Sequence, residues 1–210
     1  MGRPSDARQR LIEAGRDVIF ARTYEGASVD DLCAAAGVNK SSFYHFFPSK
    51  QALVLAAIDS QWQWFEATVL APIFQSDIAP QDRLLRFFDQ TCERQRDEKA
   101  SSGQMRGCPA GNLTLEMSAQ DALIGARVDR FFREWLGYFE QMLEDAKERG
   151  MVPAALDTAL TAQALLAYFE GVMLLAKGRN DPTLVHRLRT GALALMGYRG
   201  AGGESDFIGH

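Results

Sequence analysis

The chain has 210 residues, of which 47% are hydrophobic, and a formal net charge of −4. This size and composition suit a globular protein of one large or two small domains. The sequence contains no run of about 18 apolar residues, and its polar, basic N-terminus lacks the apolar core of a signal peptide. We therefore expect a cytoplasmic protein with no transmembrane helix and no contact with a membrane.

The distribution of charge and the cysteines narrow the class of protein further. The first 50 residues hold seven basic and six acidic side chains, so the acidity lies in the remainder of the chain. This contrast is modest and does not by itself identify a nucleic-acid-binding protein. Three cysteines without a CxxC spacing argue against a disulfide framework or a zinc site and fit a reducing compartment. We expect no metal and no cofactor.

The first predicted element is a helix over about residues 5–22, which follows a short arm. Its apolar residues recur at helical spacing and form one face. They are Leu11, Ile12, Gly15, Val18 and Ile19. A connection that contains Gly26 ends this element.

Residues 28–50, with the sequence SVDDLCAAAGVNKSSFYHFFPSK, are predicted to form two short helices joined by a tight turn. Ser28 is a suitable N-cap of the first helix, and Asp31 can reach back to it in a capping box. Gly37 stands where a helix ends in a left-handed residue, and Asn39 can cap the second helix. A short, polar helix held by a glycine turn is typical of a helix-turn-helix that reads DNA.

Helices are also predicted for the rest of the chain, without strands. One helix of about 20 residues begins at Ser49 and ends near Pro72. Ser118 and Asp121 form a second capping-box signature in front of a long, aromatic-rich helix. The other predicted elements are a helix over residues 80–96, a polar loop over residues 97–107 with a short helix after it, and two C-terminal helices that begin at Asp157 and Asp181.

Residues 37–50, GVNKSSFYHFFPSK, resemble the recognition segment of TetR-family transcriptional repressors. Two positions depart from the family pattern: Ser41 replaces a frequent glycine, and Phe46 replaces a His or Tyr. The resemblance implies an all-α fold of about nine helices. It implies a helix-turn-helix DNA-binding domain at residues 5–65 (reader pair 28–47), a larger ligand-binding and dimerisation domain at residues 66–198, and a tail at residues 199–210 that we expect to be disordered.

The resemblance also implies that the chain is a DNA-binding transcriptional regulator and not an enzyme. The expected form is a homodimeric repressor that a small-molecule or electrophile effector releases from a palindromic, double-stranded DNA operator. Two other classes stay open: a helical small-molecule-binding protein without a DNA role, and a cysteine-dependent enzyme. The enzyme is disfavoured because no histidine can be paired with a cysteine from the sequence and no phosphate-loop motif is present.

The side chains expected at DNA lie in the arm, at the helix caps and along the second helix of the pair. They are Arg3, Ser28, Val29, Asn39, Lys40, Ser41, Ser42, Tyr44, His45 and Lys50. The helix turn that begins at Lys40 can reach base edges or phosphates, and Tyr44 is expected at the DNA backbone. Lys50, in the first turn of the next helix, is placed to meet a phosphate. Arg3 can lie in the minor groove, and a frayed terminus is the alternative.

The second domain is expected to hold an effector pocket with aromatic walls, suited to a hydrophobic or aromatic ligand. The candidates are Trp62, Phe65, Phe88, Met105, Phe131, Trp135, Tyr138, Phe139 and Phe169. A packed core has the same composition, so core packing is the alternative for each of them. The sequence alone does not separate the two.

Cys108 is a candidate sensor of electrophiles. It lies in the segment GCPAGNL, which resembles a segment of the N-ethylmaleimide- and acrylate-responsive subgroup of the family. The resemblance implies a reactive thiolate, which requires exposure and a lowered pKa. A buried structural thiol beside a glycine turn is the alternative. Cys33 and Cys92 are expected to be packing residues.

The last two helices are expected to form the dimer interface. By the resemblance, they pair with their copies in a second protomer as a four-helix bundle. Small residues along them allow close approach of helices, and packing inside one protomer is the alternative. The expected interface residues are Ala164, Ala167, Tyr168, Gly171, Leu188, Ala192 and Leu195.

Overall fold

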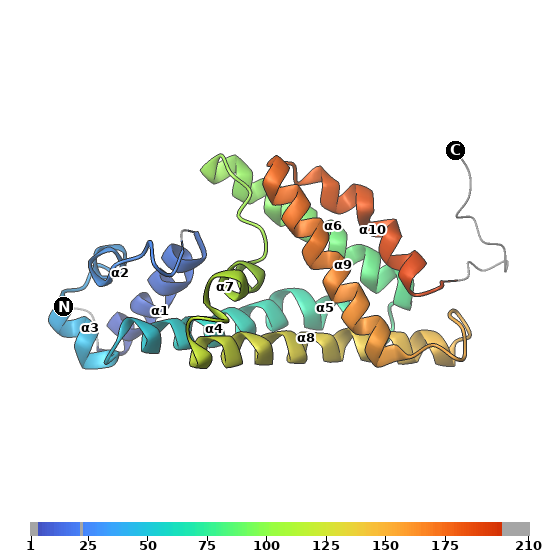
Figure 1. Cartoon of the computed structure of the whole chain (residues 1–210), viewed down its shortest axis with the longest axis horizontal. Coiled ribbons are helices and arrows are strands. Elements are labelled where there is room, and N and C mark those ends of the chain that lie inside the picture. Colours follow the sequence, from blue (N-terminus) through green and yellow to red (C-terminus); the bar gives the residue numbers. More distant parts are fainter. Residues whose placement is uncertain (1–3, 22, 199–210) are drawn as a thin grey trace. The chain divides into compact units, whose positions relative to one another are not determined.

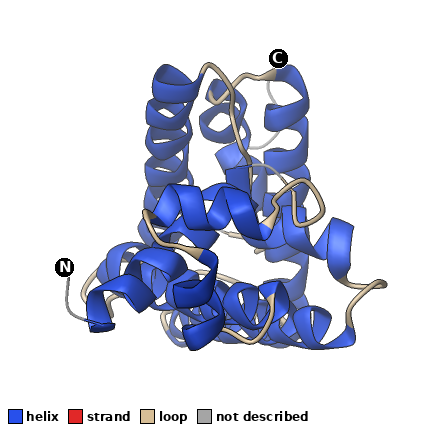
Figure 2. Ribbon diagram, turned by 90° about the vertical axis from the view of Figure 1, so that its left-hand side faces the viewer, coloured by secondary structure: helices blue, strands red, loops and turns tan. Residues whose placement is uncertain are grey.

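The computed structural model describes residues 4–21 and 23–198, and within these ranges it contains helices and loops but no strand (Figures 1 and 2). The prediction of an all-α fold is confirmed. The predictions for Arg3 and for the tail at residues 199–210 lie outside the described residues. The elements are α1 (Pro4–Ala21), α2 (Val29–Ala36), α3 (Lys40–Phe46), α4 (Lys50–Phe65), the π-helical segment η1 (Glu66–Leu70), α5 (Ala71–Ile73), α6 (Pro80–Ser102), α7 (Pro109–Met117), α8 (Ala122–Glu148), α9 (Thr158–Arg179) and α10 (Thr183–Leu195).

The segments α4, η1 and α5 follow one another without a break, so the described residues form nine continuous helices. The chain divides into two compact units: unit 1 contains Met1–Phe65 and Pro109–Phe132, and unit 2 contains Glu66–Cys108 and Arg133–His210. The first boundary falls at the predicted end of the N-terminal domain. The segment Pro109–Phe132, which the sequence assigned to the second domain, groups with unit 1.

In unit 1, α1 packs against α2 and α4 around a small apolar core. Leu11, Leu32, Phe43 and Leu53 are completely buried there. Gly15 of α1 allows a close approach to α4, because a Cβ atom at this position would lie 3.2 Å from Cγ of Leu53. The core thus fixes α2 and α3 on a base made of α1 and α4.

In unit 2, α6, α9 and α10 lie side by side (Figure 1). Phe87 of α6 occupies the centre of an aromatic cluster: its ring centroid is 4.8 Å from that of Phe169, 5.5 Å from Trp135 and 5.7 Å from Phe139. All four rings are buried. Edge-to-face and tilted pairs of this kind add to the stabilisation from apolar burial.

Two predicted boundaries are wrong. Helix α6 continues through most of the predicted loop at residues 97–107, because helix-forming residues there outweigh their polarity, and it ends at Gly103 in a left-handed conformation (φ 79°). The predicted capping box of Ser118 does not form. Asp121 itself caps α8, and its Oδ1 accepts hydrogen bonds from the backbone N–H groups of Leu123 (3.0 Å) and Ile124 (3.1 Å).

Candidate functional site

The pair α2–α3 is built by local capping, as predicted. The Ser28 hydroxyl accepts a hydrogen bond from the backbone N–H of Asp31 (3.1 Å), and the Asp31 carboxylate accepts one from the N–H of Ser28 (2.9 Å). Gly37 ends α2 in the left-handed conformation, with φ 61° and ψ 41°. Asn39 caps α3 through a hydrogen bond from the N–H of Ser42 to Oδ1 (2.8 Å). These bonds satisfy helix-end groups and hold the turn in one geometry.

Helix α3 has an apolar inner side and a polar outer side. Phe43 is completely buried, and Phe47, directly after the helix, is 3% exposed. The predicted contact residues Lys40, Ser41, Tyr44 and His45 are exposed, and Ser42 is half-buried. Tyr44 packs its ring edge against Phe43, with centroids 5.2 Å apart, while 53% of its surface stays open to solvent. The helix thus presents donors and acceptors on a surface anchored by one phenylalanine.

The remaining predicted contact residues of this pair have local partners. Ser28 and Asn39 use their side chains as caps, and Val29 is half-buried. Lys40 forms an exposed ion pair with Asp30, with Nζ 2.9 Å from Oδ1. The hydrogen bond and charge of Asp30 raise the pKa of Lys40, so this side chain is cationic at neutral pH.

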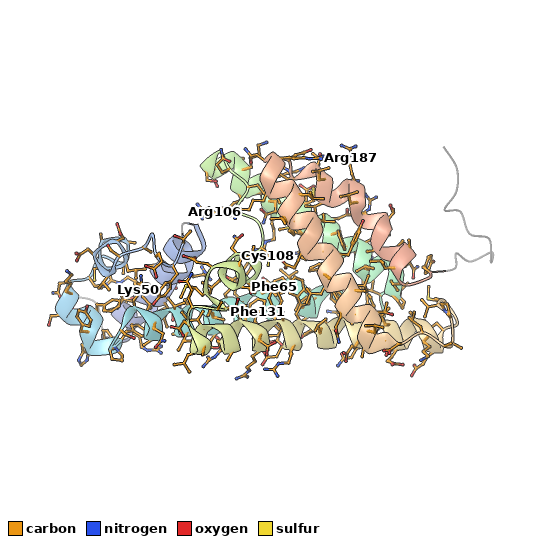
Figure 3. The ribbon with its side chains drawn as sticks, in the orientation of Figure 1. Lys50, Phe65, Arg106, Cys108, Phe131 and Arg187 are labelled. Carbon is orange, nitrogen blue, oxygen red and sulfur yellow. The ribbon has the colours of Figure 1, made fainter. Side chains whose placement is uncertain are left out.

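Lys50 differs from its prediction. Its ammonium group donates to the backbone oxygens of Tyr24 (3.0 Å) and Ala27 (3.1 Å) and lies 4.1 Å from the centre of the Tyr24 ring. An ammonium group has three N–H donors, so these contacts occupy them (Figure 3 labels Lys50). In this conformation Lys50 fastens the loop between α1 and α2 and is not directed at a phosphate.

The predicted effector residues do not form one set, because they belong to both units. In unit 1, Phe65 and Phe131, both labelled in Figure 3, stack with centroids 5.8 Å apart. Trp62 meets Phe131 edge-on, with centroids 5.0 Å apart. Trp62 and Phe65 are half-buried. The remaining candidates, in unit 2, are Phe88, Met105, Trp135, Tyr138, Phe139 and Phe169.

Most of the unit 2 candidates are core residues. Phe88, Met105, Trp135, Phe139 and Phe169 are each at most 3% exposed. Tyr138 is the exception: it is half-buried, and its hydroxyl donates to Oε1 of Glu66 in η1 (3.0 Å). Burial, together with the Glu66 carboxylate, raises the pKa of Tyr138 to about 12. Most of the aromatic residues predicted to line an effector pocket in unit 2 are therefore core residues, which was the alternative explanation of the sequence pattern.

Cys108 is half-buried, and its thiol is hydrogen-bonded to the carboxyl group of Glu170 on α9. Burial raises the pKa of Glu170, and the bond from Cys108 opposes that shift. Arg94 of α6 is close enough to interact with Cys108, and burial lowers its pKa. The backbone beside the thiol is fixed because Gly107 has a φ of 79° and its N–H donates to Gln95 Oε1 (3.2 Å).

The sequence prediction missed Glu170 and Arg94. A signal for Glu170 was available: it is the one acidic residue of α9, a helix otherwise rich in leucine, alanine and other small residues. A carboxyl group in such a helix is costly to bury unless it has a partner. The other cysteines, Cys33 and Cys92, are buried, as expected for packing residues.

The pair α9–α10 presents an apolar outer surface. Small residues and leucines recur at helical spacing on the exposed side of α9, and Leu195 of α10 is 43% exposed. Of the predicted interface residues, Ala164, Ala167 and Gly171 are exposed, whereas Tyr168 and Leu188 are half-buried. The exposed apolar stripe of α9 consists of Leu160, Ala164, Ala167, Gly171, Leu174 and Gly178.

The prediction that Ala192 lies at the dimer interface is wrong, because this residue is completely buried inside the protomer. In the described part of the chain, α9 is the one helix that is long and apolar enough to cross a membrane by length and composition, although the sequence suggested none. Only 33% of its most apolar stretch is buried. The rest of that stretch is exposed or half-buried in the single protomer.

Both parts of the chain match known protein families. Residues 11–57 match the family described as bacterial regulatory proteins, tetR family. Residues 80–192 match the family described as tetracyclin repressor-like, C-terminal domain. The two matches include the α2–α3 pair and the helices from α6 onward, apart from the last residues of α10.

Three relatives are named as transcriptional regulators. The HTH-type transcriptional repressor DhaR of Mycobacterium sp. (strain GP1) is 30% identical over 170 residues, which cover 81% of this chain and 82% of DhaR. The transcriptional regulator AcuR of Cereibacter sphaeroides is 32% identical over 180 residues, with coverages of 86% and 80%. The HTH-type transcriptional repressor NemR of Escherichia coli (strain K12) is 25% identical over 172 residues, with coverages of 82% and 84%.

The fold agrees with these relatives. The crystal structure of regulatory protein TetR from Rhodobacter sphaeroides superposes with a TM-score of 0.76 at 32% identity, covering 88% of this chain and 96% of that chain. The match includes a helix-turn-helix and a larger helical domain, the architecture that the sequence predicted. The chain therefore belongs to the TetR family and is a DNA-binding transcriptional regulator with a C-terminal ligand-binding domain.

Proposed function

We propose that this protein is a cytoplasmic, non-enzymatic repressor that binds a palindromic operator as a homodimer and leaves it when an effector binds. The observation that carries the proposal is the exposed polar side of α3, held by the caps Ser28 and Asn39 and anchored by buried Phe43. A short helix with this arrangement can enter the major groove, where side-chain donors and acceptors meet base edges.

We assign direct DNA contacts to the exposed side chains of α3. Lys40, Ser41 and Ser42 lie in the first turn, where base edges are within reach, and Tyr44 and His45 lie one turn further on. Lys40 would exchange its exposed partner Asp30 for a phosphate at little cost, because such surface ion pairs are weak. Ser28 and Asn39 support these contacts as caps.

We assign the dimer interface to α9 and α10. The stripe of leucines and small residues on α9 would be covered by the same stripe of a second copy, as in an isologous interface. TetR regulators are dimers, and a palindromic operator requires two reading heads. A second copy also accounts for the apolar side of α9 better than lipid does, because charged Glu170 and Lys177 interrupt that helix.

We assign the effector response to the surroundings of Cys108. Its thiol bond to Glu170 and its proximity to Arg94 make this a polar site within unit 2. Alkylation replaces the S–H bond of the thiol by an S–C bond, so it would remove the hydrogen-bond donor from a carboxyl group that burial already destabilises as an anion. The loss of this hydrogen bond at Glu170 would then favour a different conformation, one with lower affinity for the operator.

The experiment is a mobility-shift titration with a labelled fragment from the chain's own upstream region. Ser41→Glu places a carboxylate on α3, and the matched control Ser76→Glu places one at an exposed position of unit 2. We expect Ser41→Glu to abolish the shift, because like charges repel, and the control to retain it. Equal binding by both variants would exclude α3 as the reading surface.

A second arm tests the effector site with N-ethylmaleimide as the probe. Alkylation should release the wild-type protein from the fragment, and Cys108→Ser should remain bound at the same reagent concentration. Buried Cys33 and Cys92 serve as internal controls, since mass spectrometry reports which thiol reacts. Release of Cys108→Ser by the reagent would exclude Cys108 as the sensor.

A further inference from the structure

The loop between α1 and α2 is fastened by a carboxylate that is distant in sequence. Glu116, in the last turn of α7, accepts two hydrogen bonds from consecutive backbone N–H groups: Tyr24 N to Oε2 (2.8 Å) and Glu25 N to Oε1 (3.0 Å). All three residues belong to unit 1. Both bonds are charge-assisted, and the carboxylate spans the two donors as a bidentate acceptor.

Lys50 holds the carbonyl groups of the same loop. Its ammonium group donates to the oxygens of Tyr24 and Ala27, at 3.0 Å and 3.1 Å. The neighbouring residue Gln51 donates to Asp121, the cap of α8, at 2.5 Å. The loop therefore has two of its N–H groups bound by the Glu116 carboxylate and two of its carbonyl groups bound by the Lys50 ammonium group.

This loop leads directly into the N-cap of α2. Ala27 is completely buried, and Ser28 follows it as the cap. Any freedom of the loop would change the direction in which α2 starts, and with it the placement of α3. Recognition sites depend on residues outside the contact surface that hold the contacting groups in position to within about 0.5 Å.

We propose that Glu116 is a positioning residue for DNA recognition, and that α7 is thereby a working part of the DNA-reading unit. Glu116 acts through the loop at residues 23–27 and touches no DNA itself. Lys50 is its counterpart on the other side of the loop. The position of α3 in the major groove thus depends on a helix that lies outside the helix-turn-helix segment of the sequence.

A substitution that removes the charge of Glu116 distinguishes this role from a purely electrostatic effect, because the two predict opposite changes in operator affinity. DNA is a polyanion, so removal of a carboxylate from a DNA-binding unit raises affinity when charge alone acts. Loss of the fastening lowers operator affinity, because the reading helix then samples other positions. Glu116→Gln keeps the shape of the side chain and one acceptor, and it removes the second acceptor together with the charge.

The test measures operator affinity by fluorescence anisotropy for Glu116→Gln and for the control Glu25→Gln, which removes the same charge from an exposed side chain of the same loop. We expect Glu116→Gln to lower operator affinity about tenfold, at an unchanged salt slope. Binding to an unrelated duplex should not fall, and Glu25→Gln should bind as wild type or tighter. Equal behaviour of the two variants would overturn the proposal.

Hydrogen exchange supplies a readout at the contact itself, on full-length protein with wild-type helicity. The amides of Tyr24 and Glu25 should exchange faster in Glu116→Gln, and those of α1 should be unchanged. Lys50→Met serves as a second variant, which releases the loop from its other side and should also lower affinity at an unchanged slope. Wild-type exchange at Tyr24 and Glu25 in Glu116→Gln would overturn the proposal.

Discussion

In the pairs α2–α3 and α9–α10 the first helix ends in the same backbone conformation, but the exposed sides differ in polarity. In each, the first helix ends in a left-handed residue, Gly37 with φ 61° and Asn180 with φ 50°. The exposed side of α3 is polar, whereas the exposed side of α9 includes Leu160, Leu174 and Leu175. The turn sets the geometry of a helix pair, and the exposed side selects the partner, DNA in one case and a second copy in our proposal.

The two joints also differ in how they are held. The α2–α3 turn relies on its own caps, with one long bond from Arg10 to the oxygen of Gly37 (3.5 Å). Asn180 is held by tertiary bonds: its Oδ1 accepts from Met105 N (2.8 Å), its Nδ2 donates to Gly103 O (3.1 Å), and its own oxygen accepts from Lys99 Nζ (2.6 Å). A locally specified joint can be recognised in a sequence, whereas the second requires the fold.

The largest expected effect is the loss of the dimer in Leu174→Glu. A carboxylate in a closed apolar interface is strongly unfavourable, so we expect at least about a hundredfold shift towards monomer, together with loss of operator binding. Analytical ultracentrifugation at micromolar concentration measures the shift. Leu115→Glu is the matched control, because Leu115 is 80% exposed on α7 of unit 1. A dimeric Leu174→Glu would place the interface elsewhere.

The second largest expected effect concerns the packing between α9 and α10 inside one protomer. A Cβ atom at Gly191 would lie 2.1 Å from Oη of Tyr168, whose hydroxyl donates to the oxygen of Leu188 (2.7 Å). Gly191→Ala should therefore destabilise the fold by about 2 kcal/mol through overpacking, which lowers Tm by about 5 °C. Gly137→Ala, where a Cβ atom meets nothing within 4 Å, should not lower Tm.

The third expected effect is smaller and compares two lysines. Lys40 is expected to contact DNA, whereas Lys50 supports the α2–α3 pair from the loop before it. Lys40→Ala should lower the salt slope of operator binding by about 0.9 for each phosphate lost and affinity by about tenfold. Lys50→Ala should lower affinity and leave the slope unchanged, because its ammonium group binds Tyr24 and Ala27. A reduced slope for Lys50→Ala would mean that it leaves those carbonyls to meet a phosphate.

The smallest effect concerns Glu170 on α9 and depends on pH. Burial raises its pKa above the ordinary value of 4.5, so the folded state favours the protonated carboxyl. That contribution is complete below pH 4.5 and is lost as pH rises through the folded-state pKa. Glu170→Gln should therefore gain about 1 kcal/mol in urea unfolding at pH 7.5 and nothing at pH 4. An equal gain at both pH values would point to packing.

The features that could be predicted are those that depend on neighbours within about four residues. Ser28, Gly37 and Asn39 satisfy backbone groups one turn away, so their roles were visible in the sequence. The prediction for Lys50 did not include its partners Tyr24 and Ala27, because they come from a loop that only the fold brings near. A first-turn lysine has the same sequence whether it binds carbonyls or phosphates.

The effector region was harder to predict for two physical reasons. Aromatic residues that line a cavity and those that fill a core have the same spacing, and Trp135, Phe139 and Phe169 proved to be core. The partner of Cys108 is Glu170, which lies 62 residues further along the chain. The sequence predicted the turn that carries Cys108 and the helix that carries Glu170, but the pairing follows from how these segments pack in the fold.

The π-helical segment η1 has a consequence for packing. Its i→i+5 bonding accommodates one residue more than an α-helical turn, and it lies between α4 and Pro72. Regular α-helical winding of the same residues would rotate the following side chains by about 100°. Leu70 and Ile73, which are buried, would then face other surroundings. The burial of Leu70 and Ile73 therefore depends on the wide winding of η1.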